Sequence, residues 1–149
     1  MEATISQSKR KMWVVINYFA LVLLIASFYT ADRVGLTAVT ISAGIFAILA
    51  IIVSFIQAYA RTGLWRFVHT KAEKLDEREM MMTYESLRRS YGLFAVVCLV
   101  VFLFAELITK EFSGGYRLAL MPVIAALIYL AHILPASVIA WTEKEIYRA

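Results

Sequence analysis

Residues 34–60 read VGLTAVTISAGIFAILAIIVSFIQAYA, a run of 27 positions without a charged side chain. A helix needs about 20 predominantly apolar residues to cross the ~30 Å hydrocarbon core of a bilayer. Residues 12–31 and 118–142 are uncharged runs of similar length, and 90–105 form a shorter run that reaches 109 if Glu106 is tolerated. The sequence therefore predicts four membrane spans, at about 12–31, 34–60, 90–109 and 118–142.

The composition agrees with this prediction. Of the 149 residues, 62% are hydrophobic and only 17% are charged, whereas an ordinary soluble domain is about half apolar and a quarter charged. The spans leave too little chain for a soluble domain, which excludes a soluble enzyme and a nucleic-acid-binding domain. The single cysteine, Cys98, lies inside a span and cannot form an internal disulfide.

The distribution of Lys and Arg predicts the topology, because basic residues concentrate in cytoplasmic loops. The predicted cytoplasmic side holds Lys9, Arg10, Lys11, Arg61, Arg66, Lys71, Lys74, Arg78, Arg88, Arg89, Lys144 and Arg148. The other side holds only Arg33, Lys110 and Arg117. We therefore expect a multi-pass cell-membrane protein whose two termini and segment 61–89 are cytoplasmic, with Tyr59 and Trp65 as interface anchors on that side.

Segment 61–89 is the longest connection between spans. Gly63 is expected to end the second helix, and the aromatic stretch 64–68 is expected to lie along the lipid headgroups. Thr70 and Glu73 form a capping-box pattern, and no proline follows before Ile108. The predicted fold is thus an all-α, four-helix transmembrane bundle of two helical hairpins, whose third helix extends into the cytoplasm.

This extension carries two candidate surfaces. Met80, Tyr84, Leu87 and Tyr91 recur at i, i+4, i+7 and i+11, which makes an apolar stripe on a helix. A docking interpretation assigns partner binding to Trp65, Phe67, Met80, Tyr84 and Leu87. It assigns contacts with anionic lipid headgroups to Lys71, Lys74, Arg78, Arg88 and Arg89. The plainer interpretation is a solvated stalk in which Glu85 pairs with Arg89, although we expect the stripe to pack, in the same chain or against a second copy.

The acidic-basic cluster Asp76-Glu77-Arg78-Glu79 lies just ahead of the third span. It resembles a juxtamembrane motif of uncharacterised small bacterial and archaeal membrane proteins built from two helical hairpins. The resemblance covers the middle segment and the start of the third span. It implies a prokaryotic inner membrane and brings no known activity, ligand or mechanism.

Asn17, Glu106 and His132 are candidate functional residues inside the spans, since polar groups in hydrocarbon are costly and need a partner or a purpose. They would line the path of a small oligomeric transporter or channel, and a histidine such as His132 can also serve as a haem ligand. The plainer interpretation gives His132 a hydrogen bond to Asn17, to a tyrosine or to the carbonyl that Pro135 leaves without its usual donor. Glu106 is likewise expected to pair with Lys110.

Each span also has one face of small or weakly polar residues, which lets helices approach closely in lipid. We expect these four faces to line the bundle interior. They are Asn17, Ala20, Leu24, Ser27 and Ala31; Ala43, Ala47, Ala50, Ser54 and Ala58; Tyr91, Ala95, Cys98, Phe102 and Ala105; and Ala125, Tyr129, His132, Ala136 and Ala140.

The sequence predicts neither a metal site nor a cofactor. The consecutive Met80, Met81 and Met82 point about 100° apart on a helix, so they cannot converge on one copper ion. A haem with two axial histidines needs a second intramembrane histidine, whereas His69 lies in the cytoplasmic segment. Motifs of the common enzyme classes are absent from the sequence. We therefore predict a non-enzymatic membrane subunit or scaffold that associates with itself or with other membrane proteins, the alternative being the transporter.

Overall fold

The structure, a computed structural model, describes residues 6–111 and 120–143. Its elements in chain order are α1 (Gln7–Val34), α2 (Ala38–Phe55), a π-helical turn (Ile56–Ala60), α3 (Leu64–His69), a 3₁₀ turn (Ala72–Lys74), α4 (Glu77–Glu111) and α5 (Leu120–Thr142). Four of these helices are long and apolar enough to cross a membrane. The predicted all-α, multi-pass membrane fold is therefore confirmed. Arg117, Lys144, Arg148 and the side chain of Lys110 lie outside the described residues.

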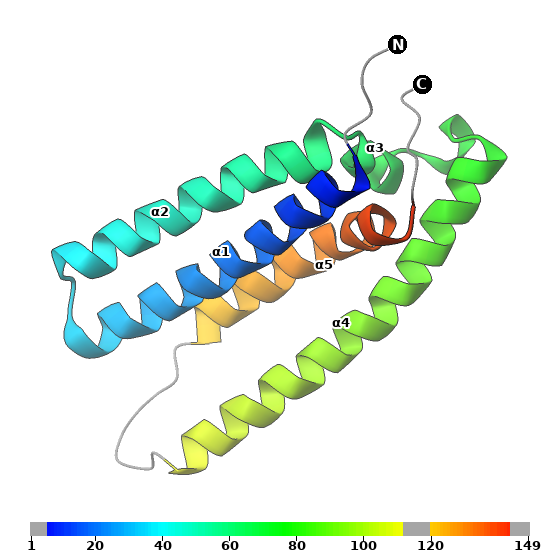
Figure 1. Cartoon of the computed structure of the whole chain (residues 1–149). Coiled ribbons are helices and arrows are strands. Elements are labelled where there is room, and N and C mark those ends of the chain that lie inside the picture. The colour runs from blue at the N-terminus through cyan, green and yellow to red at the C-terminus, as the bar shows by residue number, and fades with distance from the viewer. Residues whose placement is uncertain (1–5, 112–119, 144–149) are drawn as a thin grey trace.

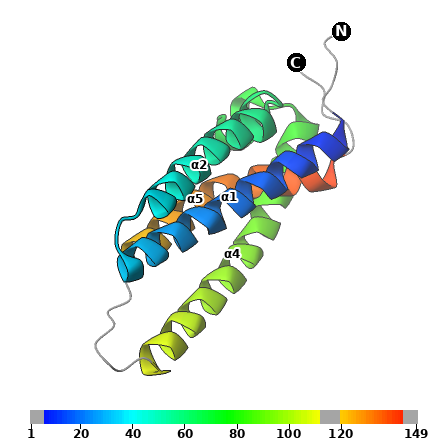
Figure 2. The ribbon, with the colours of Figure 1, turned by 60° about the vertical axis from the view of Figure 1, so that its left-hand side comes forward.

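The four long helices pack as two pairs, α1 with α2 and α4 with α5, and α1 also packs against α5 (Figure 1). The short helix α3 lies where α1 begins and α5 finishes, and we call this the α3 end of the bundle. The opposite end, with the turn between α1 and α2, is the far end. Toward the far end α4 diverges from α1 and α2 (Figures 1 and 2). The helices are therefore gathered at the α3 end and splayed at the far end.

Glycines allow the two sharp turns between helices. Gly63 adopts a left-handed conformation with φ of 76°, which confirms the predicted stop after the second helix and leads directly into α3. Gly35 has φ of 88° and ends α1. Side chains with a Cβ rarely adopt such angles. Thr37 and Thr40 then form a reciprocal capping box that satisfies the first amides of α2.

The start of α4 corrects one prediction. The capping box is formed by Asp76 and Glu79: the backbone N–H of Glu79 donates to Asp76 Oδ1 at 2.6 Å, and that of Asp76 donates to Glu79 Oε2 at 3.3 Å. The pattern at Thr70 and Glu73 matches the same motif in sequence but precedes only a 3₁₀ turn. From Glu77 the helix runs without a break to Glu111, so the predicted continuity with the third span holds over these residues.

Replacing Asp76 with alanine is expected to destabilise the first turn of α4 by about 1 kcal/mol, because the amides of that turn lose their acceptor. The measurement is amide hydrogen exchange of residues 77–83, which should become faster. The matched control is Glu73→Ala, which removes the acidic residue of the other capping pattern. Equal exchange rates in both variants would show that α4 does not depend on the Asp76 cap.

The aromatic stretch after Gly63 is part of the core, which corrects the expectation that it lies along the headgroups. Leu64 is fully buried and Phe67 is 7% exposed. Both belong to a cluster with Val14, Tyr59 and Ile133, at the meeting of α1, the π-helical turn, α3 and α5. The turn at Gly63 folds α3 back onto α5, so the apolar face of α3 contacts protein.

The small-residue faces predicted for α1 and α2 are buried or half-buried along their whole length. On α5 the prediction holds for Tyr129, Ala136 and Ala140, but Ala125 and His132 are exposed. On α4 Cys98 and Ala105 are half-buried, but the prediction is wrong for Tyr91, Ala95 and Phe102, which are exposed. The packing face of α4 instead consists of Thr83, Ser86, Ser90, Phe94, Val97 and Val101.

Hydroxyl groups explain why this other face of α4 packs. Ser90 Oγ donates to the carbonyl of Ser86 at 2.6 Å, and Ser86 Oγ donates to that of Thr83 at 2.8 Å. Each hydroxyl is thereby satisfied by its own helix, and the short side chains allow close approach. Thr83 Oγ1 also lies 3.4 Å from the carbonyl oxygen of Phe67, which links α4 to α3.

Candidate functional site

A buried polar group connects three of the membrane helices near the α3 end. Asn17 of α1 has no exposed surface. Its Nδ2 donates to Ser54 Oγ of α2 at 2.9 Å. The hydroxyl of Tyr129 on α5 lies 2.9 Å from Nδ2 and 3.1 Å from Oδ1 of Asn17, so it contacts both ends of the amide. The side chain of Asn17 is therefore satisfied by its own bundle, as a polar group in hydrocarbon requires.

A second polar layer lies next to the first and is centred on Ser137 of α5. The hydroxyl of Tyr18 donates to Ser137 Oγ at 2.7 Å, and that of Tyr59 lies 2.8 Å from the same atom. Ser137 Oγ itself donates to the carbonyl of Ile133 at 2.9 Å. The serine oxygen thus accepts from two tyrosines that belong to different helices. These two layers, Asn17–Ser54–Tyr129 and Tyr18–Ser137–Tyr59, are called the polar network below.

The π-helical turn brings Tyr59 into this network. The backbone N–H of Arg61 donates to the carbonyl of Ile56 at 2.9 Å, five residues back. The wider turn places the consecutive residues Ala58 and Tyr59 both inside the core. Tyr59 is therefore not the interface anchor that its position in the sequence predicts. Tyr18 and Ser137 were detectable as polar groups within spans, but no sequence signal marks the π-helical turn.

The first turn of α1 is tied to the end of α5. Gln7 Nε2 donates to the carbonyl of Trp141 at 3.1 Å, and Arg10 Nη2 donates to that of Glu143 at 2.6 Å. The Lys11 ammonium lies 4.9 Å from the centre of the Trp141 ring. The carbonyls at the end of a helix lack partners within that helix, so Gln7 and Arg10 satisfy two of them. The contact of Lys11 with Trp141 also joins α1 to α5 at the α3 end.

His132 does not join the polar network. It is exposed on α5, and its Nδ1 lies 2.8 Å from the carbonyl oxygen of Ile128. The structure thus describes a contact with Ile128 in place of the predicted bonds to Asn17, to a tyrosine or to the carbonyl of Ala131. Its ring instead lies parallel to that of His69, with the centroids 6.4 Å apart. His69 stacks on Trp65 at 3.7 Å. The fold thus brings together two histidines that are 63 positions apart in the sequence.

Asn17, Glu106 and His132 occupy three different environments. Asn17 is buried in the polar network, His132 is exposed beside α3, and Glu106 is exposed on α4 toward the far end. The Asn17 side chain is hydrogen-bonded to Ser54 and Tyr129 of the polar network. The structure therefore does not join these three residues into one path.

The residues predicted to bind a partner separate into two groups. Phe67 is buried, and Trp65 is half-buried with its ring 5.1 Å from that of Phe55, so both already pack within this chain. Met80 is half-buried, whereas Tyr84 is 64% exposed and Leu87 is also exposed. Of the predicted partner-binding residues, Tyr84 and Leu87 on α4 are therefore the exposed ones.

The basic residues predicted to meet lipid headgroups are all exposed. They are Lys71, Lys74, Arg78, Arg88 and Arg89. Arg89 Nη2 lies 2.5 Å from Glu85 Oε1, which confirms the predicted pair one helical turn apart. An exposed pair of this kind contributes little to stability.

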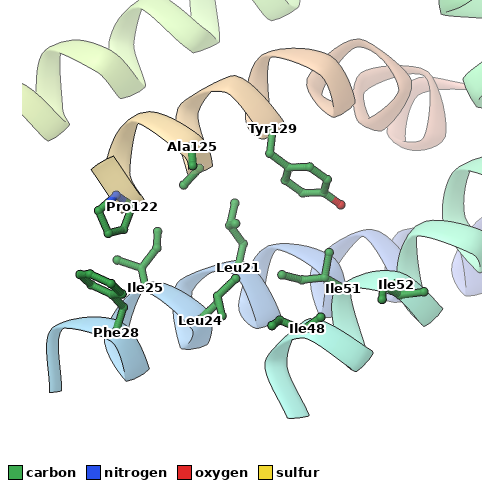
Figure 3. Close-up of a pocket in the computed structure, with 11 residues that line it drawn as sticks. Leu21, Leu24, Ile25, Phe28, Ile48, Ile51, Ile52, Pro122, Ala125 and Tyr129 are labelled. Atoms are coloured by element: carbon green, nitrogen blue, oxygen red, sulfur yellow. The ribbon is translucent and has the colours of Figure 1, made fainter. Parts of the chain in front are cut away.

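Two cavities lie in the splayed half of the bundle. One, of about 510 Å³, is bounded by α1, α2 and α5 (Figure 3). Leu21 and Ile25 extend from α1 toward Pro122 and Ala125 of α5, and Ile48 and Ile51 of α2 line the remaining side. The other, of about 500 Å³, lies between α1, α4 and α5 and is lined mainly by aliphatic and aromatic side chains. Both volumes are typical of sites for small ligands.

Comparisons of the chain with protein-family models, with curated protein sequences and with solved structures found no match.

Proposed function

We propose that this protein is a non-enzymatic membrane subunit that assembles with a second copy of itself through α4. The observation that supports the proposal is the stripe on the first half of α4. Tyr84 and Leu87 are exposed although they precede the third predicted span, and Tyr91 is exposed at the start of that span. Large apolar side chains on such a surface favour a protein contact.

The spacing of the stripe favours a second copy as the partner. Met80, Tyr84, Leu87 and Tyr91 alternate by four and three residues, which is the spacing of the core positions in a two-stranded coiled coil. Two identical helices related by a two-fold axis along the membrane normal present the same stripe to each other. The packing face of α4 is separate from the stripe and is already used by α3 and α5. Self-association therefore requires no rearrangement of the bundle.

The orientation and location belong to the same proposal. Lys9, Arg10 and Lys11 begin α1 at the α3 end, and the basic residues of 61–89 lie between the second and third spans. The α3 end therefore faces the cytoplasm under the positive-inside rule. The exposed Lys71, Lys74 and Arg88 would then meet the anionic cytoplasmic leaflet. The juxtamembrane resemblance supports a prokaryotic inner membrane.

Changing Tyr84 and Leu87 together to lysine is expected to convert a dimer into a monomer, because two charges would face two charges across the stripe. The measurement is native mass spectrometry after extraction in mild detergent, with two differently tagged copies co-expressed to detect exchange. The control is Met81→Lys, since Met81 is 72% exposed on another side of the same helix. That variant is expected to remain dimeric.

Two results would contradict the proposal. Monomeric wild-type protein would remove the second copy as the occupant of the stripe. Equal loss of dimer in the Met81 variant would show that any charge on α4 disrupts assembly and that the stripe has no special role.

A further inference from the structure

We infer that the cavity between α1, α2 and α5 is a binding site for one hydrocarbon chain of a membrane phospholipid. The cavity occupies the splayed half of the bundle, where α2 and α5 both border α1 (Figure 3). Its lining is aliphatic or aromatic throughout, and its one polar group is the hydroxyl of Tyr129. That hydroxyl is held by Asn17. A polar solute would therefore lose its hydration in this cavity without gaining equivalent hydrogen bonds.

The inner end of the cavity is closed by the polar network. Tyr129 lines the cavity, and its hydroxyl contacts Asn17, which in turn contacts Ser54. This chain of contacts joins α5 to α1 and α2, so the three helices converge at that level. A molecule that enters from the far end therefore meets a wall of hydrogen-bonded side chains and extends no further.

The inner end of the cavity lies about one leaflet deep in the bilayer. Phe28 and Leu21 line it along α1, and Leu21 lies about 18 Å from Arg33 along the helix at 1.5 Å per residue. Arg33 stands in the last turn of α1, where a basic side chain is expected at headgroup level. Half of a ~30 Å hydrocarbon core is about 15 Å. The lining residues 21–28 extend over about 10 Å of α1, so the cavity lies within the far-end leaflet and its inner end lies near the middle of the membrane.

The bilayer around the protein determines which kind of molecule can occupy the cavity. An apolar cavity remains dry, and in a bilayer the molecules at hand to fill it are hydrocarbon chains. A hydrocarbon chain between α2 and α5 makes dispersion contacts with both walls, and these contacts are missing when the cavity is empty. The occupant is therefore an acyl chain of a phospholipid in the far-end leaflet, and it fills the space between α1, α2 and α5.

The test is photo-crosslinking in vesicles of phosphatidylethanolamine and phosphatidylglycerol that contain phospholipid with a diazirine near the methyl end of one chain. For the wild-type protein we expect adducts on the cavity residues of 21–28, 48–52 and 122–129. Ala125→Phe fills the cavity and should abolish these adducts. The matched control is Ala131→Phe, because Ala131 is an exposed alanine on the same helix that does not line the cavity.

A second pair of variants approaches the cavity from α2, in case the first affects folding. Ile48→Trp should also abolish the adducts, whereas Ile45→Trp, on an exposed position outside the cavity, should retain them. Native mass spectra should show one phospholipid retained per chain in the wild type and its loss in the two cavity variants.

Two outcomes would overturn the inference. Adducts spread evenly over exposed positions such as Phe46 would mean ordinary contact with the surrounding lipid. Unchanged adducts in Ala125→Phe and Ile48→Trp would place the labelled chain elsewhere. The same spectra report the number of protein copies, so failure of this site is distinguishable from failure of self-association through α4.

Discussion

Replacing Ala136 with leucine is expected to destabilise the bundle by about 3 kcal/mol, the upper part of the usual range for overpacking a filled core. Ala136 has no exposed surface and lies in the cluster that α1, the π-helical turn, α3 and α5 form together. The added carbons would have to displace backbone as well as side chains, because small residues at such positions set the distance between helices.

The measurement is the free energy of unfolding in mixed micelles, obtained by titration with SDS and followed by circular dichroism. Ala131→Leu is the control, since Ala131 is an exposed alanine on the same helix. It should change the free energy by less than about 0.5 kcal/mol, as surface substitutions usually do. Similar losses in the two variants would mean that α5 tolerates no enlargement anywhere and that the close approach at Ala136 is not special.

The second large effect is expected at Asn17, where alanine should cost about 2 kcal/mol. The substitution removes the bonds to Ser54 and Tyr129 and leaves the Tyr129 hydroxyl without its contact to the amide. Hydrogen bonds between membrane helices contribute about 0.6 kcal/mol each on average, and a buried group left unsatisfied adds about 1–3 kcal/mol. The same SDS titration measures the loss.

Ser42→Ala is the control for this variant. Ser42 is exposed on α2, and its hydroxyl donates only to the carbonyl of Val39 on the same helix. Adding Tyr129→Phe to Asn17→Ala completes a double-mutant cycle, and the two changes should be non-additive because they remove the same contact. Additive losses would indicate that Asn17 and Tyr129 stabilise the bundle independently.

The sequence predicts α1 and α2 more accurately than α4. On α1, the face from Asn17 to Ala31 is identified correctly because polar and small residues recur there at helical spacing. On α4, two faces compete: the Met/Tyr stripe is the more hydrophobic, yet Thr83, Ser86 and Ser90 form the face that packs. Hydrophobicity does not separate protein-facing from lipid-facing sides, because lipid is as apolar as a protein core.

The polar residues inside the spans are likewise predicted only in part from the sequence. Asn17 is identifiable from the sequence as a polar residue inside a span, but its partner Tyr129 is not distinguishable from His132 by spacing alone. The two lie three positions apart on α5, and the rotation of that helix about its axis decides which of them reaches Asn17. The proximity of His69 to His132 depends in turn on the fold of α3 against α5.

The number of spans and the all-α class follow from the sequence, because each hydrophobic run must satisfy its backbone hydrogen bonds internally within lipid. The sequence also shows where glycine turns the chain, at Gly63. Three features become visible with the packed helices alone: which face of α4 packs, the entry of Tyr59 into the core, and the apolar cavity between α1, α2 and α5. These features depend on helix rotation and separation, which arise from side-chain packing between segments distant in the sequence and leave no periodic signal in any one of them.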